Sequence, residues 1–297
     1  MSKRTISISS ESYLSSSLGQ LKIKIKNDHK SHSIPLEDIG FLVLENNRIT
    51  LSAHLIEELV SRNVATIFSN KNYMPVGMVL PLSGHQLQQE VSAHQINASL
   101  PLKKQLWAQT IRHKLKNQAH VLKILGANPN YINERINSVK SGDNTNEEAK
   151  AARYYWKQLF QTDFTRERYG SPPNNYLNYG YAILRSAIAR ALTGSGLLPT
   201  FGIHHHNRYN AYCLADDIME PYRPFVDLLV YDTMSKFPNE AELTKEIKSC
   251  LLTVPVLDVK MGAEKSTLLV SSHETAASLS KCFRGETKKI KYPDLCI

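Results

Sequence analysis

The stretch Pro81–His85, with the sequence PLSGH, divides this chain into two parts with different sequence patterns. Before it, short runs rich in β-branched and aliphatic residues are typical of strands. After it, long stretches carry apolar residues at helical spacing. We therefore expect an α+β protein in which a small β-rich domain, residues 1–85, precedes a larger and mainly α-helical domain, residues 86–297.

In the N-terminal part, one helix is expected among several short strands. The helix Ser52–Arg62 has Ser52 as a plausible N-cap, and its inward side is formed by Leu55, Ile56, Leu59 and Val60. The predicted strands are Thr5–Ile8, Leu21–Ile25, Gly40–Leu44, Ala65–Phe68 and Gly77–Leu80. This combination predicts a small mixed domain dominated by sheet.

The second part begins with a polar connector of some helical tendency, residues 86–101. The predicted helices are Leu100–Leu125, Tyr131–Val139, Asn146–Phe160, Asn175–Leu192, Ala215–Met234, Glu240–Leu252 and Glu274–Phe283. Val256–Lys260 is expected to form a short strand, and the basic tail Thr287–Ile297 is left unassigned.

Two kinds of metal ligand occur close together in this second part. Phe201–His206 (FGIHHH) supplies imidazole nitrogens, and Asp216–Pro221 (DDIMEP) supplies carboxylate oxygens. The polar segment Asn207–Asn210 between them suits a turn that returns the chain to the same place. Because proline is tolerated only near the first turns of a helix, we expect Glu220 near a helix entrance.

Glu148 is a third candidate ligand, on the predicted helix Asn146–Phe160. It shares one stripe of that helix with Ala151, Ala152, Tyr155 and Leu159. A buried charge persists only when it is paired or bound to a metal. The neighbouring Glu147 turns about 100° away and is ordinary first-turn chemistry, favoured by the helix dipole.

Plainer interpretations stay open for each of these features. Glu148 is also explained as a first-turn acid, with Thr145 or Asn146 as the N-cap. The three histidines are equally explained as a solvated loop, and the acids from Asp217 to Asp227 as an exposed stripe.

Four motifs, in order and spacing, resemble those of the CRISPR adaptation integrase, the subunit that inserts new spacers into the array. The match is closest to the type II branch of that family and covers nearly the whole chain. The motifs are Glu148 followed by Ala151–Tyr155, Asn175–Leu184 (NYLNYGYAIL), Phe201–His205 (FGIHH) and Asp216–Pro224 (DDIMEPYRP).

The resemblance implies a catalytic metal site made by Glu148, His205 and Glu220, which would hold Mg²⁺ or Mn²⁺. Among the histidines, His205 is chosen because it stands three residues after Gly202, as the family's ligand does. Asp217 matches a further acid of the family. It would either hydrogen-bond a metal ligand without contacting the ion or bind the ion weakly. The implied reaction is attack of a DNA 3′-hydroxyl on a phosphodiester at the end of a CRISPR repeat.

The chain departs from the family pattern at two places. Ala149 stands where many relatives carry Gly, and a run of three histidines replaces one or two. The run leaves open whether His204 and His206 belong to the site or face DNA.

The resemblance also implies partners. These are double-stranded DNA as spacer precursor and as CRISPR repeat, a second copy of the chain paired through the N-terminal domain, and a small partner subunit that joins two such dimers in a heterohexamer. Effector and accessory adaptation proteins complete the expected set.

The charge of the chain agrees with a nucleic-acid partner. Lys plus Arg number 36 against 27 Asp plus Glu, a net charge of +9, and no acid occurs between Glu90 and Glu134. The cations expected to contact DNA are Lys103, Lys104, Arg112, Lys114 and Lys116, together with Arg153, Arg208 and Arg223 near the acids. The alternatives are that the first group solvates a packed helix and that the three arginines neutralise the acids.

Composition bounds the remaining possibilities. The 297 residues, 42% of them hydrophobic, can bury a sizeable core, and the four cysteines show no CxxC spacing. No apolar stretch is long enough to cross a bilayer. We expect a soluble bacterial cytoplasmic protein with reduced thiols and no membrane partner.

Two other function classes stay open. One is a DNA-binding scaffold without catalysis, and the other is a zinc hydrolase that uses His204 and His206.

Overall fold

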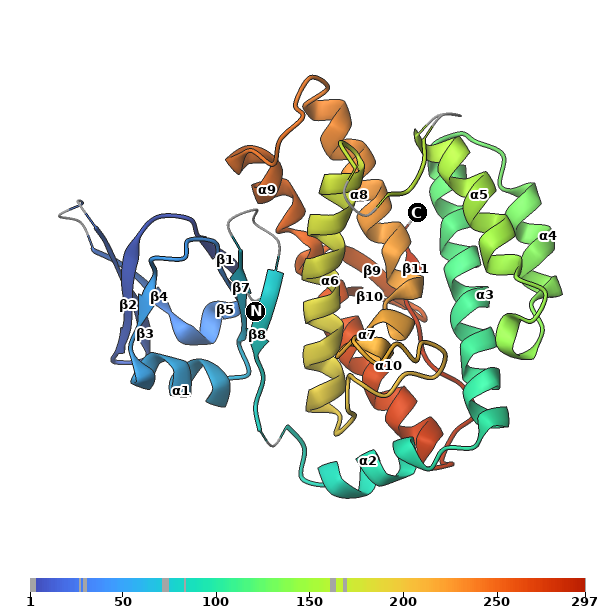
Figure 1. Ribbon diagram of the computed structural model, residues 1–297, viewed down its shortest axis with the longest axis horizontal. Coiled ribbons are helices and arrows are strands. Elements are labelled where there is room, and N and C mark those ends of the chain that lie inside the picture. Colours follow the sequence, from blue (N-terminus) through green and yellow to red (C-terminus); the bar gives the residue numbers. More distant parts are fainter. Residues whose placement is uncertain are drawn as a thin grey trace. The chain divides into compact units, whose positions relative to one another are not determined.

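The structure is a computed structural model that describes residues 4–26, 28, 31–70, 75–82, 84–160, 164–167 and 170–296. The chain forms two compact units, Met1–Gly84 and His85–Ile297. The first is built mainly of strands and the second mainly of helices, so the expected α+β class is confirmed (Figure 1). Among the described residues, no helix combines the length and the apolar character needed to span a bilayer.

The first unit contains two four-stranded sheets and the helix α1 (Ala53–Ser61). In one sheet, β1 (Arg4–Ile8), β5 (Ile39–Leu44) and β7 (Ala65–Ser69) are parallel, and β8 (Pro75–Val79) is antiparallel to β7. The other sheet has the order β4 (Ser31–Pro35), β3 (Gln20–Ile25), β2 (Ser12–Ser17), β6 (Thr50–Leu51).

The expected helix forms with the expected cap, because the Ser52 side chain accepts a hydrogen bond from the Leu55 amide at 3.2 Å. Its buried side is narrower than predicted. Leu55 and Leu59 are buried, whereas Ile56 is 37% exposed. α1 contacts β2 of one sheet and β7 of the other, and only the side chains that face these strands are buried.

The sequence pattern did not reveal β2, β4 and β6. The sequence of β2, SYLSSS, is rich in serine and has low strand propensity. It is a strand because it pairs with β3 on one side and β6 on the other, and because Leu14 is fully buried in the core. Tertiary pairing overrides local preference here.

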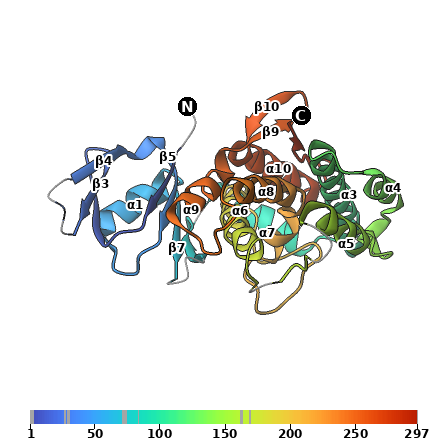
Figure 2. The same ribbon diagram turned by 90° about the horizontal axis from the view of Figure 1, so that it is seen from above.

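The second unit contains nine described α-helices and three short strands. The helices are α2 (Gln88–Ile96), α3 (Leu100–Ile124), α4 (Asn130–Ser138), α5 (Glu147–Phe160), α6 (Asn174–Gly194), α7 (Cys213–Ile218), α8 (Arg223–Lys236), α9 (Lys245–Leu251) and α10 (Leu268–Phe283). The strands are β9 (Asp258–Met261), β10 (Glu264–Thr267) and β11 (Asp294–Leu295). Within this unit, α3 packs with α4 and α5, and α6 packs with α8 and α10 (Figure 1 and Figure 2).

The predicted helix Ala215–Met234 is interrupted. α7 ends at Ile218, a 3₁₀ turn covers Glu220–Tyr222, and α8 begins at Arg223. Two prolines cause the break, since Pro221 and Pro224 lack the amide hydrogens that a continuous helix would need. Glu220 therefore lies at a helix entrance, as expected, and not on a regular helical surface.

The tail left unassigned in the sequence packs against α3. The Tyr292 hydroxyl lies 2.8 Å from the Thr110 hydroxyl, and the Lys116 ammonium lies 2.7 Å from the Asp294 carboxylate. β11 adds an antiparallel strand to β9. Each of the four cysteines, all within the described part of the chain, is a free thiol.

Gly180 sets the approach of α6 to α8, which yields a prediction. A Cβ added at Gly180 would lie 2.6 Å from Cγ1 of Val226. Gly180→Ala should therefore lower the free energy of unfolding by about 1–3 kcal/mol, measured by urea unfolding. In a Val226→Ala background, which removes that methyl, the cost should shrink; an equal cost in both backgrounds would contradict the close approach.

Candidate active site

One buried ammonium joins two of the predicted site carboxylates. Lys114 Nζ, on α3, lies 2.5 Å from Glu148 Oε1, on α5, and 2.5 Å from Glu220 Oε2, in the 3₁₀ turn. Burial opposes ionisation of Glu220, but the charges of Arg223 and Lys114 outweigh it and lower the pKa of Glu220 to about 2. Burial also opposes the charge of Lys114, yet both glutamates together raise the pKa of its ammonium.

Arg223 completes this charge cluster. Its Nε donates to Glu220 Oε1 at 2.8 Å, so each oxygen of Glu220 faces a different cation. The guanidinium of Arg223 also lies 4.5 Å from the ring centroid of Tyr181, on α6. Glu220 is thereby held by side chains from two helices.

Asp143 fixes the start of α5 and with it the position of Glu148. Its carboxylate accepts hydrogen bonds from the amides of Glu147 at 3.0 Å and Glu148 at 3.1 Å. Asn146 occupies the N-cap position, because its carbonyl accepts a hydrogen bond from the Lys150 amide at 3.2 Å, but the side chain that caps the helix is that of Asp143. Spacing did not indicate it, because an N-cap usually bonds an amide two or three residues ahead, and Asp143 reaches four and five residues ahead.

Glu147 points away from the cluster, as the helix geometry predicts. Its carboxylate lies 2.8 Å from Lys150 Nζ and 3.8 Å from Arg135 Nε. The two adjacent glutamates therefore belong to different ion pairs.

Asp217 organises the histidine segment. Its fully buried carboxylate accepts hydrogen bonds from three successive amides, those of Ile203 at 2.7 Å, His204 at 2.9 Å and His205 at 3.2 Å. The same carboxylate lies 2.5 Å from Nδ1 of His205. That hydrogen bond raises the pKa of His205 and leaves Nε2 as the ring nitrogen available to a ligand.

Gly202 allows the chain to close around Asp217. A Cβ at this position would lie 2.7 Å from Asp217 Oδ2 and would also contact the His205 carbonyl oxygen. Any larger residue would therefore push the segment away from its carboxylate.

Trp107, on α3, backs the histidines. The His204 ring stacks on it with centroids 4.1 Å apart and planes within 1°, and the His205 ring meets it edge-on at 5.9 Å. Burial lowers the pKa of His204. His206 is exposed. No motif in the sequence connects Trp107 with the histidines.

The acids from Asp217 to Asp227 are buried, so they are not an exposed stripe. Asp227, on α8, accepts hydrogen bonds from the hydroxyls of Tyr155 (2.9 Å) on α5 and Tyr181 on α6. Burial raises the pKa of Asp227 to about 7, against the opposing effect of these hydrogen bonds. The Asp227 carboxyl therefore connects α8 with α5 and α6.

The cations predicted to contact DNA lie in different surroundings. Lys114 and Arg223 join the carboxylates, Lys116 pairs with Asp294, and Arg112 donates to the Val139 carbonyl. Arg208 lies over the ring of Tyr209 at 4.6 Å, and Lys104 is exposed while Lys103 is half-buried. Only Lys114 and Arg223 among them contact the predicted metal ligands in the described part of the chain.

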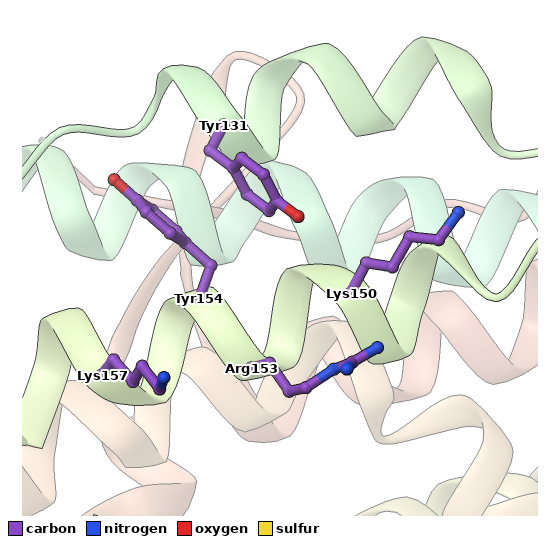
Figure 3. Close-up of a pocket in the computed structure, with 5 residues that line it drawn as sticks. All are labelled: Tyr131, Lys150, Arg153, Tyr154 and Lys157. Carbon is purple, nitrogen blue, oxygen red and sulfur yellow. The ribbon is translucent and has the colours of Figure 1, made fainter. Parts of the chain in front are cut away.

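Arg153 lines a shallow pocket of about 380 Å³ on the side of α5 away from Glu148. Lys150, Lys157 and the adjacent rings of Tyr131 and Tyr154 complete its lining (Figure 3). The pocket is open and carries positive charge.

The donor set fits a hard divalent cation. Two carboxylates already converge on one positive charge, and the buried Oε2 of Glu220 lies close to Nζ without a hydrogen bond of normal geometry. His205 is oriented through Nδ1 in the way typical of a metal-binding histidine. Within the described residues, no three His, Cys, Asp or Glu side chains are already arranged as a ligand cage. The ammonium of Lys114 lies between the two glutamates.

Comparison with known proteins decides the family. Residues 6–256 match the family model described as CRISPR associated protein Cas1. The chain belongs to the Cas1 family. A CRISPR-associated endonuclease Cas1 of Neisseria meningitidis is 33% identical over 282 residues, which cover 94% of this chain and 92% of that protein. A Cas1 endonuclease of Francisella tularensis is 28% identical and covers 81% of this chain and 82% of its own.

Solved structures share the fold. A casposase bound to integration product superposes with a TM-score of 0.81 at 18% identity, over 98% of this chain and 92% of the casposase. A Cas1 protein of Thermotoga maritima gives 0.72 at 17% identity, over 96% of this chain and 98% of its own. The expected combination of a β-rich unit and a helical unit is therefore that of known Cas1 structures.

The raised pKa of Asp227 gives a prediction for stability. Because the folded state holds this proton up to about pH 7 and the unfolded state releases it near 3.8, the free energy of unfolding should fall as pH rises between these values. Asp227→Asn cannot titrate, so its thermal stability should decline less over that range, as measured by circular dichroism. Parallel pH profiles for the two proteins would contradict a raised pKa.

Proposed function

We propose that this protein is a metal-dependent DNA integrase and endonuclease of CRISPR adaptation, of the type II branch. It joins the 3′-hydroxyl of a spacer precursor to a phosphodiester at the end of a CRISPR repeat. The observation that carries the proposal is the meeting of Glu148 and Glu220 at one cation position. His205, whose charge acts on Glu220, is oriented by Asp217.

Glu148, Glu220 and Nε2 of His205 would hold Mg²⁺ or Mn²⁺. A bound ion of this kind supplies Lewis-acid stabilisation of charge on phosphodiester oxygens. The chain's own residues prepare the site: Asp217 fixes the tautomer and direction of His205, and Arg223 fixes Glu220. No nucleotide cofactor is required, because one phosphodiester replaces another, and water as the nucleophile would give endonuclease activity.

The partners proposed are double-stranded DNA, a second copy of this chain and the small Cas2 subunit, in a heterohexamer with two Cas1 dimers. The net charge of +9 supports a DNA partner. Solved structures with this fold include a Cas6-RT-Cas1–Cas2 complex, with a TM-score of 0.71 over 96% of this chain and 35% of that one, and a casposase bound to integration product. Effector and accessory adaptation proteins remain part of the proposal.

A second candidate is a DNA-binding scaffold without catalysis. It is favoured by the ion pairs that already compensate Glu148 and Glu220. Metal-dependent turnover separates the two functions. The zinc hydrolase has no such support, since within the described residues no third ligand gathers with His204 and His206.

Removing a ligand should abolish chemistry while leaving DNA binding. Glu148→Gln, Glu220→Gln and His205→Ala are each expected to lower Mn²⁺-dependent strand transfer by at least about 10²-fold, because each loses a donor to the ion. The assay joins a labelled spacer precursor to a repeat duplex, and fluorescence anisotropy measures affinity. Glu147→Gln, one residue from Glu148 in a separate ion pair, is the matched control. A fully active Glu148→Gln protein would exclude this site.

Charge reversal at the start of α3 tests the DNA surface. Lys103→Glu with Lys104→Glu should weaken duplex binding and reduce the slope of log K against log salt by about 2, one unit for each lost phosphate contact. Lys265→Glu with Lys281→Glu makes the same change of net charge at exposed positions elsewhere in the unit. An equal effect of both pairs would show that only net charge matters, and DNA would then contact a different surface.

A further inference from the structure

Lys114 stands at the position where two candidate metal ligands meet. Its side chain is 10% exposed, that of Glu220 is 7% exposed and that of Glu148 is 31% exposed. Lys114 lies two helical turns after Trp107 on α3, so the same side of this helix backs the histidines and reaches the carboxylates. The chain therefore places a cation of its own inside the site.

This ammonium compensates two acids that would otherwise repel each other in a buried position. Nζ donates to Glu148 Oε1 at 2.5 Å, whereas its contact with Glu220 Oε2, also at 2.5 Å, is one of charge without hydrogen-bond geometry. Lysine also carries its charge on a flexible four-carbon stem.

Arg223 behaves differently. Its Nε donates to Glu220 Oε1 with normal geometry, and its guanidinium lies on the Tyr181 ring. A planar guanidinium fixed at two places stays with its carboxylate, whereas an ammonium can move. Of the two cations in the cluster, Lys114 is the one that can leave.

We propose that Lys114 is a resident cation that a divalent ion displaces from Glu148 and Glu220, and that a DNA phosphate receives the displaced ammonium. The inference rests on the metal site of the proposed function. The open side of the cluster is that of Glu148, the more exposed carboxylate, so this is where a phosphate can reach the ammonium.

The consequence is coupling between metal and DNA. Without DNA, a divalent ion must displace the ammonium and leave it without an anion, which weakens metal binding. With DNA present, the ammonium gains a phosphate partner and metal binds more tightly. Linkage requires that metal strengthen DNA binding by the same factor, and couplings of this kind are about 5–150-fold.

The test measures Mn²⁺ affinity by electron paramagnetic resonance, with and without a duplex that has 3′-dideoxy ends and cannot be joined. In the wild type, DNA should tighten Mn²⁺ binding on the order of tenfold. In Lys114→Met, Mn²⁺ should bind on the order of tenfold more tightly without DNA, and DNA should add little. Lys114→Arg, which keeps the charge, should retain weak binding without DNA.

Lys123→Met is the matched control, since it removes the same charge from an exposed position near the end of the same helix. It should behave as the wild type does. Melting curves establish that each variant folds. If Lys114→Met does not fold, Lys114→Gln takes its place. The effect of DNA on Mn²⁺ binding by the wild type can be measured without any variant.

Unchanged or weaker Mn²⁺ binding in the neutral Lys114 variants would overturn the inference, as would a wild-type affinity that does not respond to DNA. The proposed function fails by a different result. In that case the wild type binds no Mn²⁺ with or without DNA, and Glu148→Gln changes nothing.

Discussion

A charge removed from water must be compensated nearby, and the second unit is arranged around this constraint. Lys114 and Glu220 are both almost excluded from solvent, and Glu148 joins them from a third element. None of these side chains would be stable at its position alone. The packing of α3 against α5 and against the 3₁₀ turn is therefore a condition for the site, and the site in turn fixes how these elements meet.

The buried acids beyond the cluster follow the same logic. Asp217 is satisfied by three backbone amides and one imidazole, and Asp227 by two tyrosine hydroxyls. Each carboxyl binds together segments that are distant in the sequence. The acids that look like a stripe along one predicted helix are buried in the folded chain, and each one hydrogen-bonds groups from other segments.

The sequence predicted those parts of the molecule that local pattern controls. Long amphipathic stretches became helices close to their expected bounds. The expected stripe of α5 is shifted by one residue, because the buried side consists of Glu147, Ala151, Tyr155 and Leu159, while Glu148 is half-buried and reaches Lys114. The choice of His205 among three histidines came from the family resemblance, and in the structure Asp217 contacts that residue. Prolines indicated the helix entrance at Glu220 but not the full break before it.

What could not be predicted depends on distant partners. The serine-rich β2 needs two neighbouring strands, and the Asp143 cap depends on the loop that precedes α5. Lys114 was grouped with the cations expected to contact DNA, because no spacing connects a lysine on α3 to Glu148, 34 residues later, or to Glu220. A single sequence shows its charge but not which acids compensate it.

The grip of Asp217 on three consecutive amides has a thermodynamic consequence. A loop with free backbone torsions would lose conformational entropy when its imidazole became fixed by a ligand, at about 1–2 kcal/mol for each residue ordered. Here the backbone of Ile203, His204 and His205 has already lost this conformational entropy on folding. Whatever engages this imidazole meets a preorganised segment, so less of its binding free energy is spent on ordering the backbone.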